Sequence, residues 1–182
     1  MIKRSDEEIL QSRAKALASA RVDSASLAEA THDRYLVVLC GTDRFVIALE
    51  SVMEVFRASG VTPLPRAAAP LWGLTSWRGS ILPVITIDES LAGQESGVIV
   101  IIAIGSRVIA GLWANQVESE IAIDRNTIQP PHALTGIRAQ LVSGVTPDAK
   151  SVIDAESVAR LLDERTKAND QTAAINSSGI KV

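Results

Sequence analysis

Apolar residues along most of this chain occur in short runs that are separated by glycine, proline and polar residues. Glycine-containing breaks such as 41–43 and 78–80 separate pairs of runs, and glycine tolerates the positive φ of a hairpin turn. Short strands with regular turn signals predict an all-β fold, either a sandwich or small barrels. The expected strands are 34–40, 44–48, 52–56, 74–77, 81–87, 98–104, 108–114, 120–123, 141–144 and 151–153.

The expected strands fall into two groups with a break near 89–96, which suggests two subdomains. Three prolines, Pro63, Pro65 and Pro70, are expected to keep the stretch 62–70 out of any regular element, because proline lacks the N–H that a strand ladder needs. The folded body is predicted to cover 34–165.

A helix is predicted to close the folded body, from Asp154 to about Thr166. Asp154 is a favourable N-cap, and Val158, Leu161 and Leu162 give the helix one apolar face. The following segment, 166–182, consists mostly of Asn, Gln, Ser, Ala and Thr and is expected to be a disordered tail.

The segment 1–33 is predicted to be an N-terminal helix followed by a flexible linker. Ser5 and Glu8 fit a capping box, and Leu10, Ala14 and Leu17 repeat at helical spacing. An isolated helix of this length is marginal in water, so it either packs on the folded body or docks on another molecule. The candidate docking residues are Ile9, Leu10, Arg13 and Leu17.

Charge and composition exclude several partner classes. The net charge is −3 and no stripe of lysine or arginine is present, which argues against nucleic acid. The longest apolar run, Val98 to Ile104, has seven residues and is too short to span a membrane. The charged first residues lack the apolar run of a signal peptide, so a cytoplasmic protein is expected.

Candidate catalytic chemistry is sparse. His32 lies in the expected linker and His132 in a loop, and Cys40 ends an apolar strand, as a small buried hydrophobe does. The chain has no Cys/His spacing suited to zinc and no glycine-rich phosphate loop. We therefore expect no enzyme activity, cofactor or metal. A ligand-binding or enzymatic barrel with Cys40 or His132 in a deep polar pocket is the alternative.

Two stretches are more specific than an ordinary β domain requires. In the first, Val52 and Glu54 point to one face of a strand and Met53 and Val55 to the other. An ordinary alternation of core and solvent positions explains this stretch equally well. In the second, Arg78 occupies a hairpin turn between two apolar strands, where its rigid donor fork suits partner carboxylates or carbonyls. A solvated turn cation is the simpler interpretation.

A proline-rich loop precedes the second stretch and leads to Trp72 and Gly73. The tryptophan is explained equally well as a plug for one end of a barrel.

Taken in order along 34–162, these stretches resemble the CheW family of chemosensory coupling proteins. The matching residues are Phe45, Val52, Glu54, Val55, Thr62, Pro65, Gly73, Arg78, Gly79, Pro83, Val84, Ile153 and Asp154.

The chain departs from this family pattern at four positions. Ser76 and Trp77 stand where the family has Asn-Leu, Thr86 stands at an aspartate position, and Asn115 stands where the family has the aspartate of Val-Asp. The polar contacts that those aspartates make in the family are therefore absent here or made by other residues. We expect that the choice of partner can differ from that of the standard chemotaxis proteins.

The resemblance implies two packed five-stranded β-barrel subdomains and no catalysis. It further implies an adaptor, cytoplasmic but associated with membrane receptor arrays, which joins the tip of chemoreceptors, the regulatory domain of a CheA-type histidine kinase, and other CheW-like proteins. The alternative is an array spacer or sequestering protein that binds receptor or kinase without coupling them. The expected partner-binding residues are Val52, Glu54, Gly73, Thr75, Arg78 and Gly79.

Overall fold

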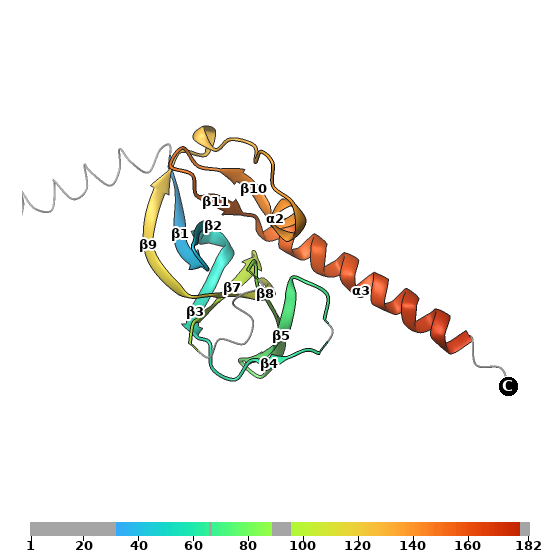
Figure 1. Ribbon diagram of the computed structural model, residues 1–182. Helices are drawn as coiled ribbons and strands as arrows, with labels where there is room; N and C mark the ends of the chain where they lie inside the picture. Colours follow the sequence, from blue (N-terminus) through green and yellow to red (C-terminus); the bar gives the residue numbers. More distant parts are fainter. Residues whose placement is uncertain (1–31, 66, 89–95, 179–182) are drawn as a thin grey trace, which may run out of the picture.

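The computed structural model describes residues 32–65, 67–88 and 96–178, with side chains up to Lys167. The predicted N-terminal helix and its docking residues Ile9, Leu10, Arg13 and Leu17 lie outside the described residues. Within the described ranges, strands dominate and form two sheets, as predicted (Figure 1).

The first sheet has five strands in the order β10-β11-β2-β1-β9. Strand β11 runs parallel to β2, and the other neighbours are antiparallel. The strands are β1 (Asp33–Cys40), β2 (Asp43–Ala48), β9 (Gln116–Ile123), β10 (Val142–Val145) and β11 (Ser151–Ile153).

The second sheet has six strands in the order β3-β7-β8-β6-β5-β4. It lies below the first sheet in the view of Figure 1. The strands are β3 (Val52–Arg57), β4 (Thr62–Pro63), β5 (Leu71–Trp77), β6 (Ser80–Ile85), β7 (Val98–Ile104) and β8 (Arg107–Ala114).

The expected subdomain break near 89–96 lies almost entirely outside the described residues, and the strand order shows where the chain changes sheets. All strands from β3 to β8 belong to the second sheet, and β9, β10 and β11 return to the first sheet. The chain therefore changes sheets after β2 and again after β8. The physical reason is that the apolar hairpin β1–β2 needs partners on both sides, which β9 and β11 supply from far along the chain.

The short strand β4 explains two further differences from the sequence prediction. Thr62 pairs with Leu74 and Pro63 with Gly73, so the stretch 62–70 does begin in a regular element, and the second sheet has six strands rather than five. Proline is tolerated here because β4 is at the sheet edge, where an N–H on the open side has no ladder partner.

The two sheets share one core. Phe45 and Ile47 on β2 belong to the same buried cluster as Val100 and Leu112 of the second sheet. The opposite face of β2 carries Val46, which lies in a smaller cluster within the first sheet. Because both faces of β2 are buried, its sequence is a continuous apolar run rather than an alternating one.

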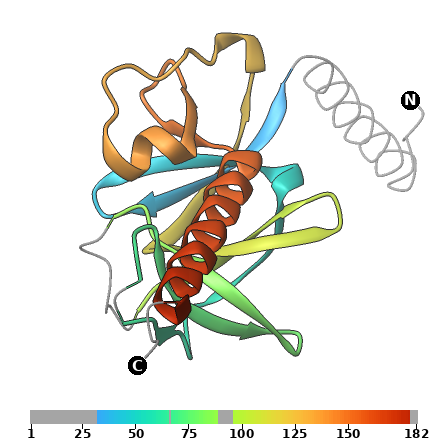
Figure 2. The same ribbon diagram turned by 90° about the vertical axis from the view of Figure 1, so that its right-hand side faces the viewer.

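Helix α3 (Ala155–Ser178) packs its first turns into the shared core. The Asp154 carboxylate accepts hydrogen bonds from the amide and hydroxyl of Ser157, at 2.9 and 2.8 Å, which is the predicted N-cap. Val158 and Leu161 are buried in the shared core. Figure 1 shows that the remainder of α3 extends away from the sheets, and in the turned view of Figure 2 the helix therefore lies in front of them.

Helix α3 continues beyond the predicted end near Thr166 to Ser178, and residues 179–182 of the expected tail lie outside the described residues. Residues 167–178 contain no glycine or proline, and the first glycine is Gly179. Adding residues to a helix that is already nucleated costs far less than starting one, so the helix continues through polar sequence.

Three short helices complete the described elements, and sequence analysis predicted none of them. They are η1 (Leu49–Ser51), η3 (Arg125–Thr127) and α2 (Gly136–Leu141). None of the helices in the described part of the chain is long and apolar enough to span a membrane.

Candidate partner-binding site

The turn between β5 and β6 presents the arginine that sequence analysis singled out. Trp77 pairs with Ser80, and the two residues between them, Arg78 and Gly79, have φ angles of +48° and +80°. Two left-handed central residues give the tight hairpin turn whose twist matches that of the flanking strands. A Cβ on Gly79 would meet nothing within 4 Å, so this glycine is required by its φ angle and not by close approach.

Glu54 on β3 receives two hydrogen bonds from this hairpin at a single oxygen. The Trp77 indole N–H donates to Glu54 Oε2 at 3.0 Å, and Nη2 of Arg78 donates to the same oxygen at 2.9 Å. The Arg78 guanidinium carbon also lies 4.7 Å from the centre of the Trp77 ring, within the range of a cation–π contact. These three residues are called the Glu54–Trp77–Arg78 cluster below.

The cluster joins β3 to the β5–β6 hairpin, although these elements are not neighbours in the sheet. Strand β3 is one edge of the second sheet, and β5 and β6 lie towards the other edge. The side chains of Arg78 and Glu54 are 66% and 37% exposed, so this bridge is at the surface and available to a partner.

The alternation predicted for β3 is present. Val52 and Glu54 are half-buried, whereas Met53 and Val55 are exposed, at 38% and 40%. Val52 packs against the shared core, so it supports the surface at Glu54 more than it forms that surface.

Gly73 and Thr75 are buried in β5, unlike the other predicted partner-binding residues. Thr75 is only 4% exposed. A Cβ on Gly73 would lie 2.6 Å from the carbonyl oxygen of Thr62, so the close approach that needs this glycine is to β4 of the same sheet. Both residues therefore shape β5 from inside rather than contact the solvent.

Sequence analysis missed two exposed apolar side chains as site candidates. Ile81 on β6, opposite Ser76, is 73% exposed, and Ile104 at the end of β7 is 38% exposed. Ile81 lies within three residues of Arg78, so an apolar contact adjoins the charged turn. The only available signal was an apolar residue at a strand position opposite a polar one.

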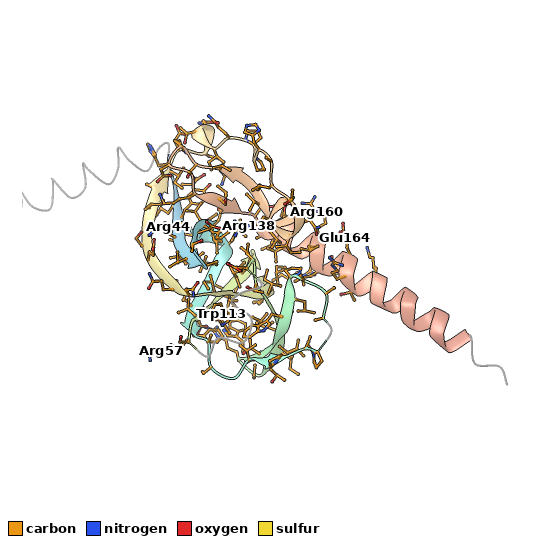
Figure 3. The ribbon with its side chains drawn as sticks, viewed as in Figure 1. Arg44, Arg57, Trp113, Arg138, Arg160 and Glu164 are labelled. Carbon is orange, nitrogen blue, oxygen red and sulfur yellow. The ribbon has the colours of Figure 1, made fainter. Side chains whose placement is uncertain are left out.

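The contacts of Trp72 favour a role in packing the fold over a role in partner binding. Its ring meets the buried Trp113 edge to face, with 6.0 Å between the ring centres and 76° between the planes. Trp113 lies within the second sheet, whereas the labelled Arg57 at the end of β3 points outward (Figure 3). Trp72 is thus a packing residue of the second sheet.

A cleft of about 610 Å³ lies where the two sheets and α3 meet. Tyr35 and Val152 line it from the first sheet, Ile104 from the second, and Glu156 from the start of α3. Arg125 also lines the cleft, and hydrogen bonding with Tyr35, together with the charge of Asp33, raises the pKa of this guanidinium. The cleft is therefore part apolar and part charged, with an arginine that stays protonated.

Besides Trp77, two of the four departures from the family pattern make contacts within the fold. The side-chain oxygen of Asn115 accepts from the Gly41 amide at 2.7 Å, so the amide oxygen serves as an acceptor at a position where the family has aspartate. The buried Thr86 donates its hydroxyl to the Asp88 carbonyl at 2.8 Å. Neither of these contacts is at the Glu54–Trp77–Arg78 cluster.

The residues considered for catalysis are not arranged for it. Cys40 is fully buried, and burial, followed by the negative charge of Asp88, raises the pKa of its thiol to about 12. The thiol is therefore protonated at neutral pH and is not a nucleophile. His132 is exposed in a loop. The described residues contain no group of three or more His, Cys, Asp or Glu side chains that could hold a metal ion.

The described residues combine two β-sheets that share one core with an exposed ion pair on a hairpin and an exposed apolar side chain, Ile81, close to it in sequence, a combination of charged and apolar side chains that is found at protein interfaces. The CheW-like domain matches residues 34–166, which is nearly all of the two sheets and the first half of α3. The chain belongs to the CheW-like family.

Individual relatives give the same result. The chain is 25% identical over 123 residues to the chemotaxis protein CheW of Treponema pallidum, covering 62% of this chain and 72% of that protein. It is 32% identical over 95 residues to protein FrzA of Myxococcus xanthus, covering 50% and 59%. The crystal structure of the scaffolding protein TtCheW from Thermoanaerobacter tengcongensis superimposes with a TM-score of 0.56 at 27% identity, covering 68% of this chain and 89% of that one.

Proposed function

We propose that this chain is a non-catalytic adaptor that couples chemoreceptors to a CheA-type histidine kinase in a bacterial chemosensory array. The observation that carries the proposal is the Glu54–Trp77–Arg78 cluster, which is exposed on the second sheet of a CheW-like domain. The family match supports the class of function, and the cluster supports a specific contact surface.

The cluster has the composition of a protein-binding surface. Arg78 presents N–H donors, Glu54 presents a carboxylate, and Ile81 offers an apolar side chain that is 73% exposed. Interfaces combine an apolar anchor with arginine and a polar rim in this way. We assign this surface to the regulatory domain of the kinase, with Val52, Gly73, Thr75 and Gly79 holding its backbone in place.

The cleft between the sheets suits the second partner. Receptor tips of this class are helical, and an apolar helix face can enter a groove that is lined by apolar side chains. Ile104 and Val152 line this cleft from opposite sheets, and Arg125, which is paired with Asp33 and Glu50, adds a charged group to its lining. We assign the cleft to the receptor tip. The array then lies on the cytoplasmic side of the receptor membrane.

Reconstitution tests the proposal with a matched pair of variants. Arg78→Asn removes the charge at the cluster, and Arg44→Asn removes an exposed arginine of the first sheet that is bonded to Glu118 at 2.7 Å. Receptors, kinase and the full chain are combined, and autophosphorylation is measured with and without attractant. Receptor-controlled kinase activity should require the chain, fall with Arg78→Asn and persist with Arg44→Asn. Equal activity for both variants contradicts the assignment of the cluster.

A spacer or sequestering protein is the second candidate, and the departure at Ser76 and Trp77 favours it. Such a protein binds receptor or kinase in titrations but adds no receptor control to kinase activity. The same reconstitution therefore separates the two candidates, since binding without activation identifies the spacer.

The predicted docking face of the N-terminal helix stays a prediction. Replacing Ile9, Leu10 and Leu17 with serine in the full chain removes the apolar stripe without removing the segment. Weaker kinase or receptor binding would identify the stripe as a docking element, and unchanged binding would assign all of the contact to the sheets.

A further inference from the structure

We propose that Trp77 orients Glu54 and Arg78 for partner binding, a role that rests on the proposed function of the cluster. Position 77 carries tryptophan, where the family resemblance described above has leucine. A leucine would supply neither an N–H donor nor an aromatic face, so the orienting role depends on the tryptophan.

The contacts of Trp77 act on both charged residues at once. Its indole N–H bonds Oε2 of Glu54 at 3.0 Å, which holds the carboxylate from one side. Its ring lies 4.7 Å from the guanidinium carbon of Arg78, which restricts that side chain to one direction. Arg78 then reaches the same Oε2 at 2.9 Å. Each pair of the three residues is therefore in direct contact.

An exposed ion pair without such support orders its side chains poorly. Exposed arginine–glutamate pairs gain little from each other because water screens them and long side chains lose entropy when they are held in one geometry. Trp77 is half-buried and packed against the shared core, so its own position is set by the fold. Arg78 is consequently ordered before a partner arrives, and less entropy is lost on binding.

Both donors of the cluster converge on one carboxylate oxygen, and the exposed Arg78 guanidinium keeps donors on its solvent side. The Glu54 side chain is 37% exposed and both of these hydrogen bonds go to Oε2, so Oε1 is the oxygen that we assign to a partner donor. The cluster therefore presents a donor and an acceptor side by side, which complements an amide group of a partner protein. Trp77 sets the spacing between that donor and that acceptor.

The experiment compares Trp77→Leu, which installs the family residue, with Trp77→Phe, which keeps an aromatic face but loses the N–H. The matched control is Ser76→Asn, which installs the family residue at the adjacent exposed position. In the full-length chain, ¹⁵N relaxation of the Arg78 Nε–H group measures its order, and titration with the kinase regulatory domain measures Kd. Unfolding curves confirm that every variant is folded at the temperature used.

Trp77→Leu should lower the Arg78 order parameter and raise Kd about three- to tenfold, in line with a lost cation–π contact and a lost hydrogen bond. Trp77→Phe should fall between Trp77→Leu and the parent chain, and Ser76→Asn should change neither quantity. On an Arg78→Asn background, Trp77→Leu should raise Kd by a smaller factor than in the parent chain, because one of the two side chains that Trp77 orients is already absent and only its bond to Glu54 remains to be lost.

An unchanged Arg78 order parameter in Trp77→Leu overturns the orienting role, and so does a loss of affinity that is fully additive with Arg78→Asn. If the parent chain does not bind the kinase domain, the proposed function fails. The relaxation measurement still decides whether Trp77 orders Arg78 in that case, so the two failures are distinguishable.

Discussion

Gly73 of β5 lies so close to Thr62 of β4 that a Cβ on Gly73 would be 2.6 Å from the Thr62 carbonyl oxygen. The obstructing atom belongs to the backbone, so relief requires movement of β4 against β5. We expect Gly73→Ala to reduce the free energy of unfolding by about 1–3 kcal/mol, as overpacking does. Urea unfolding measures this loss.

The control for Gly73→Ala is Ser76→Ala on the same strand, at an exposed position that should tolerate the change. Partner binding is compared at a temperature where all forms are folded. Reduced binding by a Gly73→Ala protein of undiminished stability would mean that Gly73 contacts the partner directly and that its packing against Thr62 is secondary.

Arg78→Asn should leave stability nearly unchanged even though it removes a charge from the cluster. Arg78 has φ at +48°, and asparagine adopts that left-handed region more readily than other non-glycine residues. This gain offsets the loss of an exposed ion pair, which contributes about 0–1 kcal/mol. We expect a change within about 1 kcal/mol by urea unfolding. A larger loss would show that the cluster is mainly a stabilising feature.

The strands were predictable because apolar runs and turn residues are local signals. Trp77 and Ser80 bracket a glycine turn, and the hairpin formed as expected. The pairing of β11 with β2 was not predictable, because Ser151 and Phe45 are far apart in sequence and no local pattern records which edge a returning strand will choose. Local patterns therefore leave open which strands share a sheet.

The candidate site was predictable only in part for the same reason. The hydrogen bond from Trp77 to Glu54 joins residues that are 23 apart in sequence, on strands that are not neighbours in the second sheet. Ile81 and Leu82 are adjacent apolar residues, one exposed and one buried, and hydropathy alone does not distinguish them. Burial likewise separates Thr75 from Arg78, although both lie in the same motif.

Ile81→Ser tests the apolar part of the proposed surface. Ile81 is 73% exposed, so its loss should change the free energy of unfolding by no more than about 0.5 kcal/mol. Binding to the kinase regulatory domain should weaken, because an apolar anchor beside Arg78 is removed. Ile85→Ala on the same strand is the contrasting variant, since burial of Ile85 predicts a loss of about 2–5 kcal/mol. Unchanged binding by Ile81→Ser would restrict the surface to the charged residues.

The ion pair between Glu118 and Arg44 makes the free energy of unfolding depend on pH in the acidic range. Hydrogen bonding to Arg44 lowers the pKa of Glu118 in the folded protein below its ordinary value of 4.5. The contribution is therefore fully present above pH 4.5 and is lost as the pH falls through the lower, folded-state pKa. Urea unfolding of the parent chain and Glu118→Gln should give a stability difference at pH 6 that shrinks towards pH 3. Arg44→Gln should show the same pattern, and a difference that grows in acid would contradict it.

Truncation after Lys167 separates the packed part of α3 from its extension. Val158 and Leu161 supply the buried contacts of the helix, and both are retained in the truncated chain. The extension points away from the sheets (Figure 1), so its removal should lower helix content by circular dichroism without lowering Tm.

Leu161→Ala in the full chain is the contrasting variant for the truncation. It removes a side chain that is 4% exposed and should cost about 2–5 kcal/mol, because the cavity lies in the core that both sheets share. Since that core joins the sheets, this loss should appear as one transition in calorimetry rather than two. Two separate transitions would mean that the sheets unfold independently, and a drop in Tm on truncation would mean that the extension contacts the folded body.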